Sequence, residues 1–382
     1  MDTIYLDNNA TTAMCDKSIL ALEAVYRDGI KNPASQHHAG RHSRRLLESY
    51  RESVGLGVTA HLTDIHADRV IFTSGGTEAN NLAIQGICGS HETPGRIVIS
   101  GIEHPSVSSA AKFLALGGWD LQTAKTLPNG QVDLEHLASL VNADTHLVCV
   151  MLANNETGVI QPVEDVVSLC ARHECMVHTD AVQALGKMVL DFRGLGVATM
   201  SISAHKIHGP PGVGALVSRH ESTFLPLFYG GFQQEGARPG TEAVALAAGF
   251  SEALDFYLDK QQKHFAYLSR LQELLEDGIL GCCPGAVVVG QGSPRLPQTS
   301  CIAFPGIDRQ AAVMALDVAG VCCSTGSACA SGSSEASPTL LAMGLAPELV
   351  EGALRFSVSI LNTEEEVRRA VAIVGEVIAC FE

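Results

Sequence analysis

The sequence predicts an α/β protein with a mostly parallel central sheet, joined to a second, smaller α+β domain. Three observations lead to this prediction. Short apolar runs alternate with amphipathic helical patterns between about residues 70 and 220. This alternation ends after about residue 240, where longer helical patterns begin. The chain has 382 residues, which exceeds the roughly 250–300 residues at which a single core stops growing.

The strands of the large sheet are predicted from short apolar runs, which are typical of buried strands. These runs comprise residues 70–73, 96–100, 146–152, 176–179, 199–203 and 214–217. Between them, apolar residues recur at helical spacing within residues 107–114, 134–141 and 163–170. Strands that alternate with helices indicate a parallel sheet covered on both faces, and such sheets bind ligands outside the carboxyl ends of their strands. We therefore expect the chemistry in the segments that directly follow the strands.

The last third of the chain has a different character. Residues 241–280 are predicted to form one or two long helices, and residues 286–289 and 301–304 are predicted as short strands. Residues 322–337 form a segment rich in glycine, serine and cysteine. We therefore expect two domains, with the first dozen or so residues packed against the second domain or over the cleft. The large domain covers residues 14–255, and the small domain combines residues 1–13 with residues 256–382.

Composition and charge exclude several classes of protein. The net charge of −16 repels phosphate backbones, so we expect no nucleic-acid partner. No stretch approaches the ~20 apolar residues of a membrane span, and the first residues show no secretory signal, so we expect a cytoplasmic protein without a membrane partner. The 12 cysteines include no CxxC pair, which argues against a zinc site, and we expect most of them to be buried.

A lysine and an aspartate end two successive predicted strands. Lys206, in SISAHKIHGPPGVGAL, lies between two histidines at the ligand-binding end of the sheet. A partly desolvated lysine can form a Schiff base with an aldehyde, although a solvated loop lysine is the alternative. Asp180, in HTDAVQALG, is suited to hold the ring nitrogen of a pyridoxal cofactor protonated, or to cap the segment that follows.

Two further strand ends carry small or polar residues. In FTSGGTEANNLAI, the backbone N–H groups of Ser74 to Thr77 can approach a phosphate at a helix N-terminus, although glycines at such a turn are often only steric. In IEHPSV, His104 opens a helix just after a strand. An imidazole at this position is suited to stack on a cofactor ring and to move a proton.

Seven segments, in the same order, resemble the fold-type-I pyridoxal-phosphate enzymes of the class-V aminotransferase family, and more narrowly the NifS/IscS group of cysteine desulfurases. They are YLDNNATT, FTSGGTEANNLAI, ANNETGVIQP, HTDAVQALGK, SAHKIHGPPGVGAL, GARPGTE and RFSVSILNTEEEV. The similarity extends from about residue 3 to about residue 375. It implies pyridoxal 5'-phosphate as the cofactor, L-cysteine as the substrate and a homodimer as the assembly, with no metal.

The resemblance also implies a role for each matched residue. Lys206 matches the Schiff-base lysine, Asp180 the partner of the pyridine nitrogen, and His104 the histidine stacked on the ring. Arg355, in LRFS, matches the arginine that binds the substrate carboxylate, for which a guanidinium fork is well suited. The other matched cofactor contacts are Gly76, Thr77, Asn155 (also near the substrate), Gln183, Ser203, His205 and, from the other subunit of the dimer, Thr241.

The GSAC segment indicates the subclass. STGSACASGSSEASP places Cys329 among small residues, within the segment 322–337. The resemblance implies that Cys329 is the nucleophile, which takes sulfur from L-cysteine as a persulfide and leaves L-alanine. An incidental thiol in an ordinary loop is the alternative. The sulfur would then pass to an acceptor protein, such as an iron–sulfur cluster scaffold, or to another thio-cofactor pathway.

Three other functions compete with this interpretation. A selenocysteine lyase would use the same residues to cleave a C–Se bond. An ordinary class-V aminotransferase would share the lysine, aspartate and arginine but would need no nucleophilic Cys329. A sulfur carrier or scaffold protein without turnover would keep the fold, but it would not need Lys206, Asp180 and Arg355 together.

Overall fold

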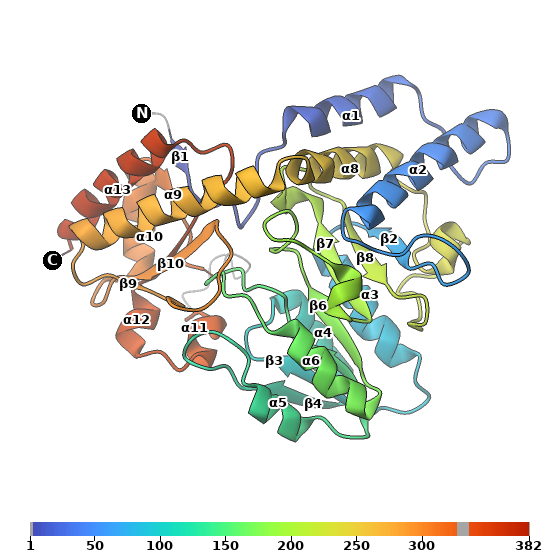
Figure 1. Cartoon of the computed structure of the whole chain (residues 1–382), viewed down its shortest axis with the longest axis horizontal. Coiled ribbons are helices and arrows are strands. Elements are labelled where there is room, and N and C mark those ends of the chain that lie inside the picture. Colours follow the sequence, from blue (N-terminus) through green and yellow to red (C-terminus); the bar gives the residue numbers. More distant parts are fainter. Residues whose placement is uncertain (1–2, 327–335, 382) are drawn as a thin grey trace.

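The computed structural model describes residues 3–326 and 336–381. Its largest sheet has seven strands in the order β2-β8-β7-β6-β5-β3-β4 (Figure 1). In that order the strands are Arg69–Thr73, Gly214–Ser218, Thr199–Ser203, Met176–Asp180, Thr145–Cys149, Arg96–Ser100 and Asp120–Ala124. β8 runs antiparallel to its neighbours β2 and β7, and the other neighbouring pairs are parallel. The predicted α/β fold with a mostly parallel central sheet is confirmed.

β4 is the one strand of these seven that the apolar pattern does not predict. Its sequence, DLQTA, is mostly polar, and it pairs only with β3 at the edge of the sheet. An edge strand has one neighbour and exposes much of its surface, so it needs no continuous apolar run. β5 ends at Cys149 instead of Leu152, but the N–H groups of Val150 and Leu152 still donate to carbonyls of the β6 strand.

Helices connect and cover this sheet (Figure 1). The three predicted helices are present as α4 (Pro105–Leu116), α5 (Leu134–Leu140) and α6 (Val163–Cys170). His104 and Asp133 each accept a backbone N–H as the cap of the helix that they precede. The other elements here are α1 (Asp16–Arg27), α2 (His38–Leu56), α3 (Gly76–Gly89), α7 (Phe192–Leu195), α8 (Val244–Leu258), η1 (Ala171–His173), η2 (Ala204–Lys206) and η3 (Gln233–Gly236).

The C-terminal part forms a second assembly beside the sheet, coloured orange to red in Figure 1. It contains an antiparallel sheet in the order β12-β10-β9, formed by Ala353–Ser357, Thr299–Ala303 and Val287–Val288. The two predicted short strands are β9 and β10, and the predicted long helical region is α8 followed by α9 (Gln261–Cys282). The remaining helices are α10 (Arg309–Val318), α11 (Pro338–Ala342), α12 (Pro347–Glu351) and α13 (Glu364–Ala379).

The N-terminal segment belongs to this second assembly. β1 (Ile4–Tyr5) pairs in parallel with β11 (Val321–Cys322). Ile4 and Leu6 are fully buried in an apolar cluster with residues of α9, β10, β12 and α13. A separate and larger cluster fills the space around the seven-stranded sheet. Residues 4–6 therefore pack against the C-terminal part, while the predicted division into two domains, with residues 1–13 in the small one and a boundary at residue 255, stays a prediction.

Within residues 3–326 and 336–381, no helix is both long enough and apolar enough to cross a membrane.

Candidate active site

Lys206 lies in η2, directly after β7, and its amine is held by the N-terminal segment. Its Nζ donates to the backbone carbonyls of Asn9 and of Ala10, the latter at 2.7 Å. The same Asn9 carbonyl accepts a hydrogen bond from the Gln183 side chain at 3.1 Å. Asn9 therefore links two predicted cofactor contacts that come from different strand ends. The Oε1 atom of Gln183 is buried, with no hydrogen-bond partner among the described residues.

Asp180 ends β6, the strand beside β7, and is 6% exposed. Its Oδ2 accepts from the Asn80 amide at 2.6 Å, and its Oδ1 accepts from the N–H of Val182 at 3.0 Å. Both donors are neutral. Two titratable neighbours of this carboxyl group also favour neutral forms. Burial and Asp180 together raise the pKa of Glu103 to about 8, and burial lowers the pKa of His178 to about 4.

His104 is connected to Asp180 through two side chains. As the cap of α4, its Nδ1 accepts the backbone N–H of Ser106 at 3.1 Å and lies 2.7 Å from the Ser106 hydroxyl. That hydroxyl accepts from the Asn80 amide at 2.8 Å, and the same amide nitrogen donates to Asp180. The structure thus brings together His104 and Asp180, which are 76 residues apart in the chain.

The start of α3 and the end of β7 form the part of the site that we predict to bind a phosphate. Gly76 is tightly packed, since a Cβ there would lie 2.6 Å from Val182 Cγ2, in the segment that follows Asp180. This close packing alone explains why residue 76 is a glycine, so the glycine is not in itself evidence for a bound phosphate. Thr77, one residue further, is exposed. Ser203 is fully buried, and its Oγ has no hydrogen-bond partner within the described part of the chain.

Two lysines, Lys206 and Lys187, lie close to His205 at the same strand end. Burial, with Lys206 and Lys187 close by, lowers the pKa of His205 to about 4, so its ring is neutral near pH 7. Burial and Lys206 lower the pKa of Lys187 to about 7, and its Nζ is buried without a hydrogen-bond partner among the described residues. An anionic group bound here would be stabilised by these lysines and by the N-terminus of α3.

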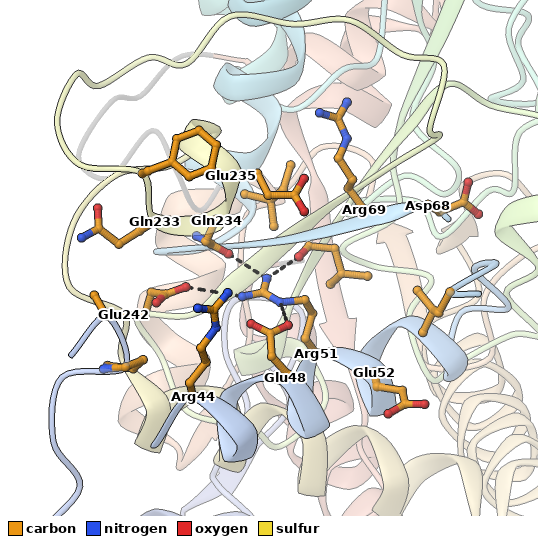
Figure 2. A pocket seen from close by; sticks show the side chains of 16 residues that line it. Arg44, Glu48, Arg51, Glu52, Asp68, Arg69, Gln233, Gln234, Glu235 and Glu242 are labelled. Carbon is orange, nitrogen blue, oxygen red and sulfur yellow. Dashed lines mark hydrogen bonds and ion pairs between the residues drawn. The ribbon is translucent and has the colours of Figure 1, made fainter. Parts of the chain in front are cut away.

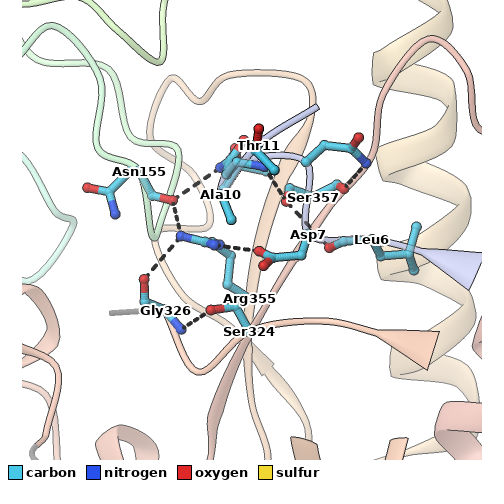
Figure 3. Close-up of polar contacts among 12 residues, drawn as sticks. Leu6, Asp7, Ala10, Thr11, Asn155, Ser324, Gly326, Arg355 and Ser357 are labelled. Atoms are coloured by element: carbon cyan, nitrogen blue, oxygen red, sulfur yellow. Dashed lines mark hydrogen bonds and ion pairs between the residues drawn. The ribbon is translucent and has the colours of Figure 1, made fainter. Parts of the chain in front are cut away.

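Arg355, on β12, is 1% exposed and already engaged within the chain (Figure 3). One terminal nitrogen pairs with Asp7 Oδ1 at 2.6 Å. The other donates to the carbonyls of Asn155 at 3.2 Å and of Gly326 at 3.0 Å. The Asn155 carbonyl also accepts from the Asn9 side chain at 3.1 Å, so this arginine belongs to the same network as Lys206.

Cys329 lies outside the described residues, but both flanks of its segment are described. Ser337 donates to Glu156 Oε2 at 2.6 Å, and a Cβ on Gly326 would lie 2.5 Å from the same oxygen. Both flanks therefore contact one buried carboxyl group, whose pKa is raised by burial. Of the 11 described cysteines, seven are buried, as expected, and only Cys282 and Cys380 are exposed.

Thr241 is exposed, and no hydrogen bond within the described residues joins it to another predicted site residue. Its neighbour Glu242 lines a separate cavity of about 710 Å³ (Figure 2). In this cavity Arg51 pairs with Glu48 at 3.0 Å and donates to Gln234 at 2.9 Å.

In the described chain, no group of three or more histidine, cysteine or acidic residues is arranged to hold a metal ion.

Four residues of this site are not singled out by the sequence. They are Asp7, Asn9, Asn80 and His178. All lie inside the motifs that carry the family resemblance, which is the one signal that could have found them. Their partners, however, are distant in the chain, with Asn80 and Asp180 separated by 100 residues and Asp7 and Arg355 by 348.

Comparison with known proteins identifies the family of this chain. The model of the family described as aminotransferase class-V matches residues 4–370, and the chain belongs to this family. Within it, the chain is similar to the cysteine desulfurases. It is 37% identical to "Cysteine desulfurase NifS" of Azotobacter vinelandii over 379 residues, which cover 99% of this chain and 93% of that protein. It is 38% identical to a "Cysteine desulfurase" of Cereibacter sphaeroides over 380 residues, covering 99% and 96%.

Solved structures show the same fold. A NifS-like protein from Rickettsia africae matches with a TM-score of 0.89 and 30% identity, over 98% of this chain and 99% of that one. A second structure, "NIFS-LIKE PROTEIN", matches with a TM-score of 0.91 and 32% identity, over 99% and 100%. A third, "SspA in complex with cysteine", matches with a TM-score of 0.81 and 25% identity, over 94% and 100%. The fold is therefore that of the NifS-like enzymes.

Proposed function

We propose that this protein is a pyridoxal-phosphate-dependent cysteine desulfurase, which converts L-cysteine to L-alanine and keeps the sulfur as a persulfide on Cys329. One observation carries the proposal. Asp180 ends β6, Lys206 follows the adjacent strand β7 in η2, and one continuous hydrogen-bond network extends from Lys206 through Asn9 to Gln183, Asn155 and Arg355. The similarity to curated cysteine desulfurases over 99% of the chain supports the same activity.

The residues present fit pyridoxal phosphate. Two buried polar atoms, Ser203 Oγ and Gln183 Oε1, lack partners among the described residues and are suited to its phosphate and its ring hydroxyl. Asp180 is a buried carboxylate with only neutral donors, which suits a protonated ring nitrogen. When bound to Lys206, this cofactor acts as an electron sink for the α-carbon of an amino acid. The phosphate site would be completed by Gly76, Thr77 and His205. The His104 ring would lie against the cofactor ring.

Side chains of this protein would move the protons and bind the substrate. Lys206 Nζ would move the α-proton of the substrate. The His104 ring would exchange a proton through Nε2, because Nδ1 already accepts the N–H of Ser106. Arg355 would bind the substrate carboxylate, next to Asn155. It would do so in competition with Asp7, to which it is paired within the chain.

Cys329 would carry out the transfer of sulfur. Its thiolate attacks the substrate sulfur, so that an S–S bond forms while the Cβ–S bond of cysteine breaks. The electron pair of the broken bond remains on Cβ, which takes up a proton and yields alanine. The persulfide then passes to a thiol of an acceptor protein, which we propose serves iron–sulfur cluster or other thio-cofactor assembly.

We also propose a homodimer. Thr241 is exposed on its own chain, in the segment that the resemblance matches to a phosphate contact across a subunit interface. Large apolar side chains are exposed in the same region, with Tyr229 and Phe232 more than 80% accessible. A cytoplasmic location is kept as a prediction from the sequence alone.

The test is the release of alanine and sulfide from L-cysteine, with a reductant present, by the purified protein supplied with pyridoxal phosphate. Wild type should form both products, and Cys329→Ala should form neither while it still shows the visible absorption of the bound cofactor. Cys282→Ala is the matched control, since Cys282 is an exposed thiol remote from the predicted site, and it should behave as wild type. Equal turnover by Cys329→Ala would exclude the desulfurase mechanism and favour a selenocysteine lyase or an aminotransferase.

A further inference from the structure

Asn80 occupies an unusual position on α3. It is 1% exposed and is surrounded by polar groups of the site. Its Nδ2 donates to Asp180 Oδ2 at 2.6 Å and to Ser106 Oγ at 2.8 Å, while its Oδ1 lies 3.0 Å from His178 Nε2. Both N–H groups and the carbonyl oxygen of one side-chain amide are therefore used.

The orientation of the amide follows from its partners. An ionised Asp180 carboxylate can only accept hydrogen bonds, so the amide nitrogen must face it. The amide oxygen then faces His178, and His178 must carry its hydrogen on Nε2. The other ring nitrogen, Nδ1, lies 2.9 Å from the Thr199 hydroxyl, which is free to donate to it. Because burial lowers the pKa of His178 to about 4, the ring stays neutral, as this arrangement requires.

The second branch leads to His104. Ser106 Oγ receives the other N–H of Asn80, so the hydrogen of its own hydroxyl is directed to His104 Nδ1, 2.7 Å away. The backbone N–H of Ser106 also donates to this Nδ1, which confirms that it is an acceptor. A single buried amide thus sets the direction of the hydrogen bonds toward Asp180 and toward His104.

We propose that Asn80 is a positioning residue of the active site, which aligns the carboxylate of Asp180 and, through Ser106, the ring of His104. The proposal rests on the proposed function, because only there do Asp180 and His104 act on a cofactor. A side chain that hydrogen-bonds to the groups around a cofactor orients those groups. A buried carboxylate that loses a hydrogen-bond donor is left poorly solvated.

Two variants separate a donor role from simple packing. Asn80→Asp keeps the shape of the side chain but places a carboxyl group against Asp180, whereas Asn80→Ala removes the side chain. A donor role predicts that Asn80→Ala weakens the affinity for pyridoxal phosphate ~10-fold and that Asn80→Asp weakens it ~100-fold at pH 8. A packing role predicts the reverse order, with the isosteric aspartate closer to wild type.

The pH dependence of the same affinity gives a second readout. The titratable groups that face residue 80 are Asp180, His178 and, through Ser106, His104. At lower pH the carboxyl group introduced by Asn80→Asp becomes protonated and can donate to Asp180. The deficit of this variant relative to wild type should therefore shrink by several-fold between pH 8 and pH 6. The deficit of Asn80→Ala relative to wild type should not change over this range.

Gln85 provides matched controls, because it is a half-buried amide five residues further along α3 whose Nε2 donates to Asn81. Gln85→Glu and Gln85→Ala should bind the cofactor within twofold of wild type. If the Asn80 variants do not fold, Ser106→Ala tests the same amide. It should lower kcat about threefold to tenfold, while the affinity for the cofactor, held through Asp180, stays within twofold.

The outcomes are distinct. If the wild-type protein shows no absorption by bound pyridoxal phosphate, the proposed function is wrong. If wild type binds the cofactor and Asn80→Asp binds it as tightly at every pH, or more tightly than Asn80→Ala does at pH 8, the positioning role of Asn80 is wrong while the proposed function stands. If Ser106→Ala leaves kcat unchanged, the branch to His104 is wrong.

Discussion

Asp180 and Arg355 are both buried and charged, but only Arg355 is paired with an opposite charge in the described chain. Asp180 receives hydrogen bonds from the Asn80 amide and the Val182 N–H, and its titratable neighbours Glu103 and His178 favour neutral forms near pH 7. Arg355 is instead paired with Asp7 at 2.6 Å. A buried charge without an opposite charge is costly, unless a ligand supplies one.

The comparison indicates how the two ends of the site work. At Asp180 the fold leaves a negative charge to be balanced by a cation from outside, which suits a cofactor that stays bound. At Arg355 the charge is balanced already by Asp7, so under the proposed function a substrate carboxylate would bind and leave without exposing an unpaired guanidinium. Under the proposed function, the cofactor that stays bound would neutralise the unpaired charge of Asp180, whereas the substrate that comes and goes would bind an arginine already paired with Asp7.

The largest expected effect comes from removing the charge of Asp180. Asp180→Asn keeps the size of the side chain but gives the cofactor ring nitrogen no anion to hold its proton. We expect kcat for alanine formation to fall ~10³-fold, the scale of preorganised electrostatic stabilisation in active sites. Steady-state kinetics at saturating cofactor measure this. A decrease of less than tenfold would show that the uncompensated charge of Asp180 is not what the cofactor uses.

An intermediate effect, on the free energy of unfolding, is expected when His178 near Asp180 is protonated at low pH. The pKa of His178 is about 4 in the folded protein, below the ~6.5 of an unfolded chain. As pH falls, the unfolded state takes up the proton first. The stability due to neutral His178 is therefore complete above pH ~6.5 and is lost as pH falls toward 4, by up to about 3 kcal/mol.

Urea unfolding at several pH values measures this loss. His178→Asn should flatten the decrease of the unfolding free energy between pH 6.5 and 4. His173→Asn, a change at an exposed histidine, should leave the wild-type slope. Equal slopes for wild type and His178→Asn would contradict the neutral ring on which the Asp180 environment depends.

The smallest expected effect comes from weakening the internal partner of Arg355. Asp7 is about 20% exposed, and Asp7→Asn keeps an oxygen that can accept but removes its charge. The guanidinium should then bind the substrate carboxylate more readily, and KM for L-cysteine should fall by about threefold to tenfold, equivalent to about 1 kcal/mol. Asp144→Asn, at an exposed position, is the control. An unchanged or higher KM would show that Asp7 does not compete with the substrate.

Much of the fold was predictable from the sequence, because buried strands carry short apolar runs. Six of the seven strands of the large sheet were predicted in this way, and the polar edge strand β4 was not. The positions of Lys206 and Asp180 followed from the same pattern, since Asp180 ends a buried strand and Lys206 follows the next one. No pattern in the sequence predicts the pairing of Asn80 with Asp180 or of Asp7 with Arg355. Such contacts depend on which distant segments the fold brings together.

The N-terminal segment has a consequence for the order in which this chain can fold during synthesis. Asn9 and Ala10 hold Lys206, while β1 pairs with β11 and Asn8 bonds to the carbonyl of Ser357, 349 residues away. These N-terminal residues are therefore synthesised well before their partners in β11 and β12. At ~5–20 residues per second this interval is roughly 20–70 seconds. The contacts of Arg355 with Asp7 can therefore form only after β12 has been synthesised.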